Sequence, residues 1–282
     1  LLDLHGTGRV MFRNRRVNLG GFPQREVTLY ALEPGGETRK DPRVDWLIEL
    51  VGKLEDAKVL VICRTREIVE GLELAIAEKI RIKTALFHEG MELIKRDRNA
   101  AYFSEEDGAR LLICSEIGSE GRNFQFAHHL VLYDLPDTPA LLEQRIGRLD
   151  RIGQQETVCI HVPFESNSIH GALARWYHEG MNAFAQPMEG GTRLMEKFNS
   201  RMQETATDDQ AGWDNIIADT RTAKKELDAK LEAGRDRLLE MSSFNEKSAK
   251  KITTALKGID ADNTLEELML DLFAALGVGI EE

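Results

Sequence analysis

The sequence has few cysteines, and their spacing excludes the commonest uses of this residue. Only three of the 282 residues are cysteine, and no pair shows Cys-x-x-Cys spacing. We therefore expect Cys63, Cys114 and Cys159 to be buried thiols in a reducing compartment rather than a disulfide framework or a redox pair. The seven histidines show no ligand spacing, so no bound metal is expected in this chain.

Long apolar runs are also missing. No stretch approaches the roughly 20 apolar residues that cross a bilayer. The start, residues 1–5, lacks the basic and apolar regions of a signal peptide. These absences predict a cytoplasmic protein that has no membrane partner.

Positive charge is scarce relative to negative charge. The chain holds 37 Lys and Arg against 48 Asp and Glu, a formal net charge of -11, which argues against nucleic-acid binding at first sight. The acidic excess per residue is greater after residue 170. A local basic patch near the start can still bind phosphates, and its members are Arg9, Arg13, Arg15, Arg16 and Arg25.

Short apolar runs alternate with helical patterns from about residue 26 to 165. Continuous runs such as 59–63 and 111–114 are typical of strands buried on both faces. The alternation predicts right-handed βαβ units and an open, mostly parallel sheet with helices on both faces. Ligands of such sheets are expected outside the carboxyl ends of the strands. The predicted strands are 26–32, 58–63, 83–87, 110–114, 129–133 and 157–162.

Helical patterns lie between these strands and dominate after about residue 168. Asp41 before Pro42 is a plausible N-cap, and Thr65 opens another helix with a capping signal. We expect the apolar stripe in 169–184 to pack in a core. The predicted helices are 44–51, 65–75, 91–103, 138–146, 169–184, one around 194–198, 213–241, 245–256 and 264–276.

The run from 144 to 154 is the most informative stretch of the chain. It presents Arg148 and Arg151, three residues apart, with glycines at fixed offsets. The planar fork of arginine matches phosphate oxygens, and an arginine delivered from a second body can stabilise a transferring phosphoryl group. The alternative is a pair of surface arginines bound to Asp150 or Glu143.

A glycine-containing segment follows the predicted strand 110–114. Gly118 and Gly121 let the backbone approach a ligand, and free amides there could hold phosphate. The alternative is a bland turn. The segment gains significance because the next strand, then Asp134, and then the arginine run follow it in order.

Together these segments resemble motifs V and VI of superfamily-two helicases. The ending Arg151-Ile-Gly-Gln154 is similar to that of the Swi/Snf branch of DNA translocases, and Ser115 keeps the hydroxyl of that branch's usual Thr. Residues 59–67 resemble motif IV. Residues 87–91 with Arg96 resemble the motif before motif V. Within the branch, segments 5–14, 116–125, 175–180 and 232–240 resemble bacterial ATPases that bind RNA polymerase.

The resemblance implies a fold and a division of the chain. The fold is α/β, a RecA-like open and mostly parallel sheet with helices on both faces, followed by a mostly helical C-terminal region. Residues 1–40 would be the exit from a first lobe, 41–168 the RecA-like C-terminal helicase lobe, and 169–282 a helical extension.

The resemblance also implies roles for individual residues. Arg148 and Arg151 would be catalytic, reaching the γ-phosphate of ATP across a cleft, and Gln144 would orient that loop or touch nucleotide. Turn geometry is the alternative for the glycines, a solvated helix start for Arg64 and Arg96, and a strand-end cap for Asp134. The expected ATP-binding residues are Gly118, Glu120, Gly121 and Gln144, and the expected DNA-backbone contacts are Arg64, Thr65, His88, Gly90, Arg96 and Ser115.

One further absence limits the expected activity. The chain contains no Gly-x4-Gly-Lys-Ser/Thr phosphate loop and no acidic magnesium-binding motif in the right context. ATP and Mg²⁺ would therefore be bound mainly by a first RecA-like lobe. We expect this chain to supply half an ATP site and to hydrolyse no ATP by itself.

The resemblance implies a two-lobed ATPase that translocates on double-stranded DNA and stimulates the recycling of RNA polymerase. Its expected partners are RNA polymerase, double-stranded DNA and the first lobe, in the bacterial cytoplasm and nucleoid. Two alternatives stay open. One is a polymerase-binding module that docks through its helical region, and the other is the lobe of an RNA helicase, whose motif VI usually lacks the Ile-Gly-Gln ending.

Overall fold

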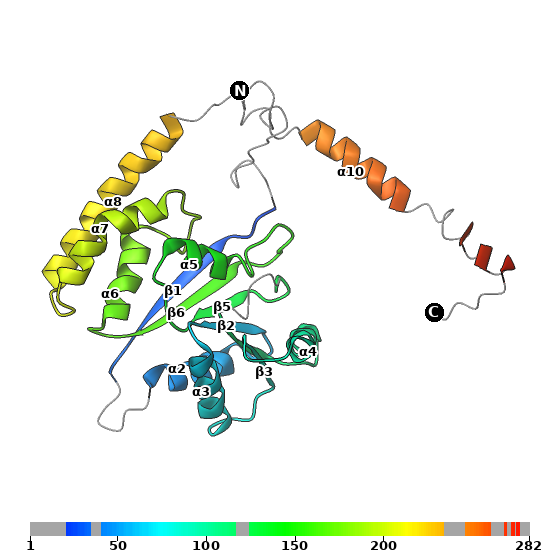
Figure 1. Cartoon of the computed structure of the whole chain (residues 1–282), viewed down its shortest axis with the longest axis horizontal. Helices are drawn as coiled ribbons and strands as arrows, with labels where there is room; N and C mark the ends of the chain where they lie inside the picture. The colour runs from blue at the N-terminus through cyan, green and yellow to red at the C-terminus, as the bar shows by residue number, and fades with distance from the viewer. Residues whose placement is uncertain are drawn as a thin grey trace. The chain divides into compact units, whose positions relative to one another are not determined.

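A computed structural model describes residues 21–34, 41–116, 124–233 and 246–260, together with 268–269, 272–273 and 275–276 (Figure 1). The chain divides into two compact units, Gly21–Gly234 and the pair of segments Leu1–Gly20 with Arg235–Glu282. Each unit is described by itself.

The unit Gly21–Gly234 is built on one six-stranded sheet in which every neighbouring pair is parallel. The order of the strands is β1-β6-β5-β2-β4-β3. Val59 in the centre of the sheet faces Leu111 on one side and His129 on the other. The strands are β1 Arg25–Leu32, β2 Val59–Cys63, β3 Thr84–Phe87, β4 Leu111–Ser115, β5 His129–Leu132 and β6 Val158–Glu165.

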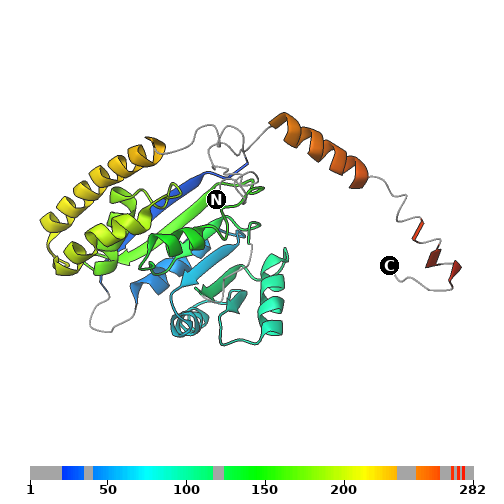
Figure 2. The same ribbon diagram turned by 45° about the horizontal axis from the view of Figure 1, so that its top comes forward.

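Helices cover both faces of this sheet (Figures 1 and 2). In β2, Val59, Val61 and Cys63 pack in the core under α2 (Pro42–Lys53) and α3 (Arg66–Ala77), while Leu60 and Ile62 belong to the core on the other face. That second core holds side chains of α4 (Leu93–Ser104) and α5 (Pro139–Ile146). All five residues of β2 and of β4 are buried, which confirms strands covered on both faces.

The starts of three helices follow from local sequence. Asp41 accepts a hydrogen bond from the Arg43 N–H at 2.9 Å, and Pro42 follows it in the first turn. Thr65 accepts from Ile68 N–H, and Thr138 accepts from Leu141 N–H. Each of these side chains satisfies a backbone donor that has no partner within the helix. The caps expected at Asp41 and Thr65 are confirmed.

The helices after residue 168 pack against the same core as the sheet. They are α6 (Ile169–Arg175), the π-helix η2 (Trp176–Gly180), α7 (Gly191–Glu204) and α8 (Gln210–Ala233). Trp176, Tyr177, Met181 and Phe184 are fully buried, so the expected core stripe is confirmed. The division expected near residue 168 falls inside the unit Gly21–Gly234, and β1 places residues 25–32 in the sheet.

The helix expected over 169–184 is wrong in its form and its end. The α-helical part stops at Arg175, a π-helical turn follows, and the chain leaves it after Gly180. Trp176 Nε1 donates to Thr220 Oγ1 at 2.8 Å, and a Cβ on Gly180 would lie 3.4 Å from Thr220. Packing against α8 therefore decides the geometry of this turn.

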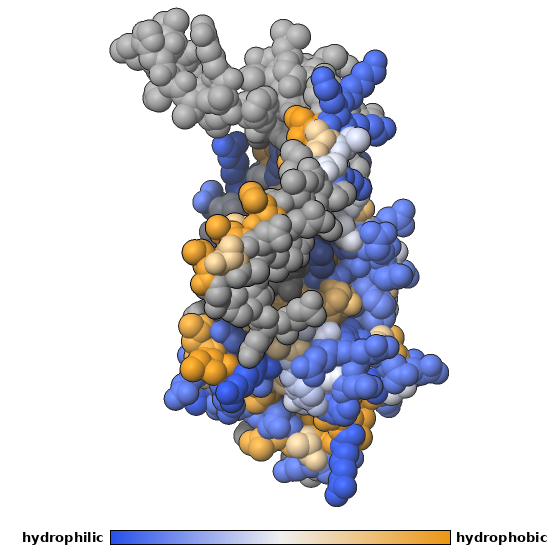
Figure 3. Space-filling model, turned by 90° about the vertical axis from the view of Figure 1, so that its right-hand side faces the viewer, coloured by the Kyte–Doolittle hydropathy of each residue, from blue (hydrophilic) through white to orange (hydrophobic). Residues whose placement is uncertain are grey.

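The second unit contributes α10 (Glu246–Asp260), close to the helix expected over 245–256, and its Ile252 and Leu256 are exposed. Most of the helix expected over 264–276 lies outside the described residues. None of the helices in the described ranges is long and apolar enough to cross a membrane. The face drawn in Figure 3 exposes hydrophobic residues in separate patches between hydrophilic ones.

Candidate functional site

The residues expected to carry function fall into two groups. The carboxyl ends of β2, β3 and β4 meet at one edge of the sheet, and the residues that follow them form what we call the carboxyl-edge cluster. The second group follows α5, which runs back from the carboxyl end of β5, and we call residues 147–154 the arginine segment. The carboxyl-edge cluster consists of Arg64, Thr65, His88, Gly90 and Ser115.

Ser115 is bound within the cluster by a carboxylate. Its side chain is at the end of β4 and only 1% of the residue is exposed. The Ser115 hydroxyl donates to Glu89 Oε2 at 2.5 Å, and this hydrogen bond lowers the pKa of Glu89. The Ser115 hydroxyl, which was expected to face a DNA phosphate, thus donates its hydrogen bond to the Glu89 carboxylate instead.

His88 and Gly90 lie against the first turns of α3. Burial lowers the pKa of His88, so its imidazole is neutral at pH 7, and its Nε2 lies 3.6 Å from Glu70 Oε1. Glu70 also binds Arg66 at 2.7 Å. A Cβ on Gly90 would lie 2.3 Å from a guanidinium nitrogen of Arg66, so the glycine makes room for that side chain.

Arg64 and Thr65 are held by contacts within the protein. Asp134, at the end of β5, accepts from the Arg64 N–H at 2.8 Å. The Arg64 guanidinium donates to the Leu135 carbonyl at 3.1 Å and to Asp137 at 2.6 Å. Thr65 is the N-cap of α3. Asp134 therefore ties two strand ends together, which is the capping role left open for it.

Arg96 lies on α4 and differs from the other members expected on DNA. Its Nε is buried and has no hydrogen-bond partner among the residues that the structure describes. Arg96 therefore stands apart from the hydrogen bonds that hold Arg64, Thr65 and Ser115 in the carboxyl-edge cluster.

Arg145 is a buried arginine that sequence reasoning missed. It is 2% exposed and lies on the last turn of α5. Its Nη1 donates to the Asp134 carbonyl at 2.6 Å, while Nε and Nη2 donate to Glu116 at 3.2 and 3.1 Å. Arg145 therefore links α5 to the residues that follow β4 and β5. Its position within the run 144–154, three residues before Arg148, could have pointed to it in the sequence.

The arginine segment lies away from the carboxyl-edge cluster. The Arg148 carbonyl accepts from Phe124 N–H at 3.1 Å, and the Gln154 amide donates to the carbonyls of Gln125 and Ala127 at 2.7 and 3.0 Å. Residues 124–128 lead into the amino end of β5. The arginine segment thus packs beside the residues that lead into β5, and the expectation that ligands lie outside the carboxyl ends of the strands stays a prediction for this segment.

The two arginines of the segment are presented differently. Arg148 is 8% exposed, whereas Arg151 is exposed and its Nε donates to the Gly147 carbonyl at 3.1 Å. Gln144, on α5, is exposed as well. The structure thus leaves the Arg151 side chain accessible to a phosphate from outside this unit.

Glu143 and Asp150 were the alternative partners expected for Arg148 and Arg151, but in the structure both carboxylates bind Arg25. Its guanidinium donates to Glu143 at 2.6 and 2.9 Å and to Asp150 at 2.5 Å. The Arg25 side chain is only 1% exposed, so its expected membership of a surface basic patch is wrong. The other expected members of that patch lie outside the described residues.

Three expected ATP-binding residues, Gly118, Glu120 and Gly121, also lie outside the described residues. No group of three or more His, Cys, Asp and Glu side chains with metal-binding geometry occurs in the part of the chain that the structure describes. Cys63 and Cys114 are buried thiols as expected, and burial raises the pKa of Cys63, whereas Cys159 is partly exposed, so the burial expected for it is wrong.

Comparison with known proteins covers nearly the whole chain. Residues 42–153 match the family described as helicase conserved C-terminal domain, and residues 157–282 match the family described as RNA polymerase recycling family C-terminal. A solved structure of the C-terminal part of the Fun30 ATPase domain is 16% identical, with a TM-score of 0.44 over 67% of this chain and 57% of that one. This score is too low to support an argument.

Curated relatives are far more similar. The chain is 44% identical to an RNA polymerase-associated protein RapA of Pseudomonas putida over 314 residues, 45% identical to that of Pseudomonas aeruginosa, and 43% identical to that of Stutzerimonas stutzeri. Each alignment covers 100% of this chain and 33% of the relative. The chain thus spans about a third of the length of these relatives, and it belongs to the RapA family as a helicase C-terminal domain followed by the family's C-terminal region.

Proposed function

We propose that this chain is the C-terminal helicase lobe of a Swi/Snf-type, ATP-dependent translocase on double-stranded DNA that associates with RNA polymerase. One observation carries the proposal: an exposed Arg151 lies in a segment braced by buried contacts, away from the carboxyl-edge cluster. A lobe with two separate functional regions can bind a nucleotide-loaded partner with one of them and nucleic acid with the other.

In this proposal the arginine segment completes an ATP site that a first lobe holds. That lobe binds ATP and Mg²⁺, and closure of the two lobes brings Arg148 and Arg151 to the γ-phosphate. The guanidinium groups then stabilise the charge that develops in the transition state. Gln144 lies on the preceding helix and contributes to the same face. Hydrolysis removes the γ-phosphate. The contact between this phosphate and the arginines is then lost, and the two lobes can open.

The carboxyl-edge cluster supplies the grip on DNA. Contacts to the phosphate backbone position a protein without reading sequence, which suits a translocase. Arg64, Thr65, His88, Gly90 and Ser115 lie at the ends of three neighbouring strands, and Arg96 on α4 completes the proposed set. Arg64 is exposed, whereas Ser115 and His88 are buried and would need a shift of Glu89 and its neighbours before they meet a phosphate. Alternate closing and opening of the lobes would move this grip stepwise along the duplex.

RNA polymerase is the proposed protein partner. The support is the printed name of the relatives and the match of residues 157–282 to the RNA polymerase recycling family. Stimulating the reuse of polymerase is the task that follows from this description. A second candidate function rests on the same match: a module that docks on polymerase through residues 169–282, with the helicase lobe as its carrier.

The test uses the full two-lobed protein. Its ATPase activity is measured with duplex DNA, single-stranded RNA and double-stranded RNA. Polymerase capture is measured for the intact protein and for one lacking residues 235–282, which lie outside the unit that holds the sheet and its core. Stimulation by duplex DNA with little effect of RNA supports the translocase. Stimulation by RNA alone favours an RNA helicase. Capture that depends on residues 235–282, with no nucleic-acid stimulation, favours the docking module.

A further inference from the structure

Arg25 is the first residue of β1, far in sequence from the arginine segment. It pairs in register with Val158 at the start of β6. No motif includes it, and its side chain is 1% exposed although it carries a permanent charge. A charge buried to this degree needs ion-pair partners, and these partners show which segments of the chain the Arg25 side chain fixes in place.

Its partners lie just before the arginine segment and within it. Glu143 lies on α5, before the segment, and accepts from Nη1 and Nη2 of Arg25 at 2.9 and 2.6 Å. Asp150 lies within the segment, between Arg148 and Arg151, and accepts from Nε at 2.5 Å. One guanidinium thus bridges the end of α5 and the turn that carries both arginines.

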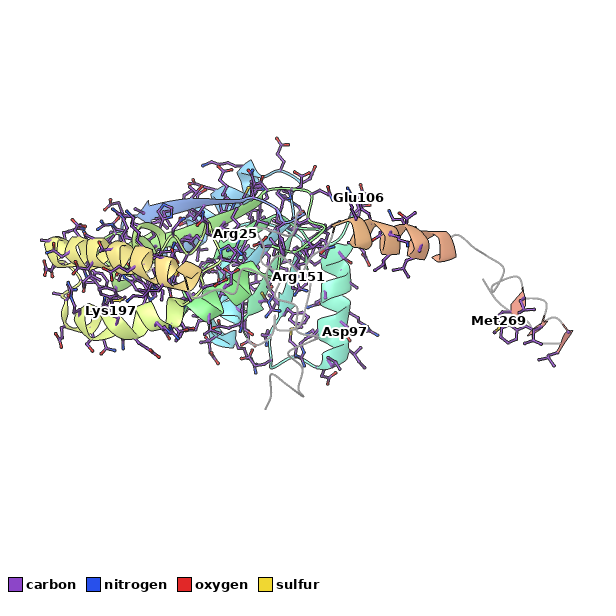
Figure 4. All side chains as sticks on the ribbon, turned by 90° about the horizontal axis from the view of Figure 1, so that it is seen from above. Arg25, Asp97, Glu106, Arg151, Lys197 and Met269 are labelled. Atoms are coloured by element: carbon purple, nitrogen blue, oxygen red, sulfur yellow. The ribbon has the colours of Figure 1, made fainter. Side chains whose placement is uncertain are left out.

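The backbone reinforces this bridge. The Gly153 N–H donates to the Gly21 carbonyl at 3.2 Å, and the Val158 N–H donates to the Gln24 carbonyl at 2.8 Å. The stretch from 21 to 25 therefore contacts the arginine segment and the strand that follows it at several points. Figure 4 labels Arg25 and Arg151 on the ribbon.

The pairing also controls where a carboxylate points. Asp150 has a side chain that is 0% exposed, and it is the neighbour in sequence of Arg151. Arg25 directs Asp150 Oδ2 toward β1.

We infer that Arg25 is a positioning residue, a clamp that holds the arginine segment against β1 so that Arg148 and Arg151 are presented in one geometry. The inference rests on the proposed role of those two arginines. The Arg25 side chain is buried, so in this inference it acts through the segment. A displacement of about 1 Å at a catalytic group can lower turnover on the order of 100-fold, so a clamp of this kind has a measurable effect.

The experiment measures DNA-stimulated ATP turnover in the full two-lobed protein. Arg25→Met removes the fork and keeps an apolar side chain of similar length, and Arg25→Lys keeps the charge alone. Arg43→Met is the matched control, because Arg43 also pairs with a carboxylate, Asp41, but binds the Tyr133 carbonyl rather than the arginine segment. KM for ATP, the affinity for duplex DNA and thermal unfolding are measured for each variant.

We expect Arg25→Met to lower kcat on the order of 10- to 100-fold, with KM and DNA affinity nearly unchanged, and Arg25→Lys to restore part of the loss. Arg43→Met should lower the midpoint of thermal unfolding and leave kcat unchanged. If Arg25 acts through the segment, adding Arg25→Met to Arg151→Ala should slow turnover no further. Full kcat in a destabilised Arg25→Met, or losses that multiply with Arg151→Ala, overturns the inference.

Two outcomes separate this inference from the proposed function. If Arg148→Ala and Arg151→Ala both keep full kcat, the proposed role of the arginines fails, and the role of Arg25 fails with it. If those variants lose turnover while Arg25→Met keeps it, only the clamp is wrong. Should Arg25→Met fail to fold, Glu143→Gln decides, because it weakens one side of the clamp at a half-exposed residue. The clamp predicts a lower kcat for Glu143→Gln, and an unchanged kcat overturns it.

Discussion

The carboxyl-edge cluster and the arginine segment are both rich in charge, yet they use it in different ways. In the cluster, the groups expected to bind DNA are occupied by carboxylates of the protein itself: Glu89 on Ser115 and Asp137 on Arg64. In the arginine segment, the carboxylates bind Arg25, while Arg151 is exposed. If the proposed function holds, the arginine segment needs no exchange of partners to meet a phosphate with Arg151, whereas Ser115 and Arg64 of the cluster must first exchange Glu89 and Asp137.

The largest expected effect is on the arginine segment. Arg151→Ala in the full two-lobed protein should lower kcat by about 10³- to 10⁵-fold, the range reported for arginine fingers, with ATP affinity changed far less. Arg148→Ala should also lose most of the turnover. The measurement is steady-state ATP hydrolysis with saturating duplex DNA. Arg201→Ala, an exposed arginine of α7 paired with Asp219, serves as the control and should keep full turnover.

The next effect is on Arg145, which joins α5 to the residues that follow β4 and β5. Its removal leaves Glu116 and buried Asp134 without this partner, and breaking a buried ion pair costs about 3–5 kcal/mol. Arg145→Ala should therefore lower the free energy of unfolding by an amount of that order, measured in denaturant. A loss below about 1 kcal/mol, the range of surface pairs, would mean that this side chain does not hold α5 to the ends of β4 and β5.

The pH dependence of the free energy of unfolding is expected to be set by a histidine pair that lies outside both regions. His129 and His161 lie 3.1 Å apart, and burial lowers the pKa of each to about 4. The unfolded chain binds these protons near pH 6.5, so the contribution is complete above that pH and is lost as pH falls toward 4.

Each shift corresponds to about 3 kcal/mol, so we expect the free energy of unfolding to fall by about 6 kcal/mol across that window. The double variant His129→Gln, His161→Gln should flatten the dependence. An unchanged slope in the variant would place the acid-sensitive groups elsewhere.

The smallest expected effect is on the carboxyl-edge cluster. Glu89→Gln removes a negative charge from the face proposed to meet phosphates, so the affinity for duplex DNA should rise about two- to tenfold at low salt and less at high salt. Glu55→Gln, on the turn after α2, is the control and should leave affinity unchanged. Weaker DNA binding by Glu89→Gln would mean that DNA does not displace this carboxylate.

Local patterns were enough to predict the strands and the starts of the helices. The continuous apolar run at Val59–Cys63 and the caps at Asp41 and Thr65 depend on neighbours within a few residues. Arg148 and Arg151 were found because their spacing is characteristic of a known motif. The structure adds that they differ in exposure, which their spacing does not show.

Contacts between residues far apart in sequence could not be predicted in this way. Arg25 is 118 residues from Glu143 and 125 from Asp150, so its pattern gave only a basic residue near the start of the chain. The π-helical turn at Trp176–Gly180 depends on Thr220, 44 residues beyond Trp176. In both cases the deciding partner becomes a neighbour only after folding.

The central claim is that this chain supplies one half of an ATP site. The most direct measurement is magnesium-dependent ATP hydrolysis, with duplex DNA present, by this chain alone, by the first lobe alone and by the two joined in one protein. We predict no turnover above background for either half and DNA-stimulated turnover for the joined protein. Clear magnesium-dependent turnover by this chain alone would contradict the account.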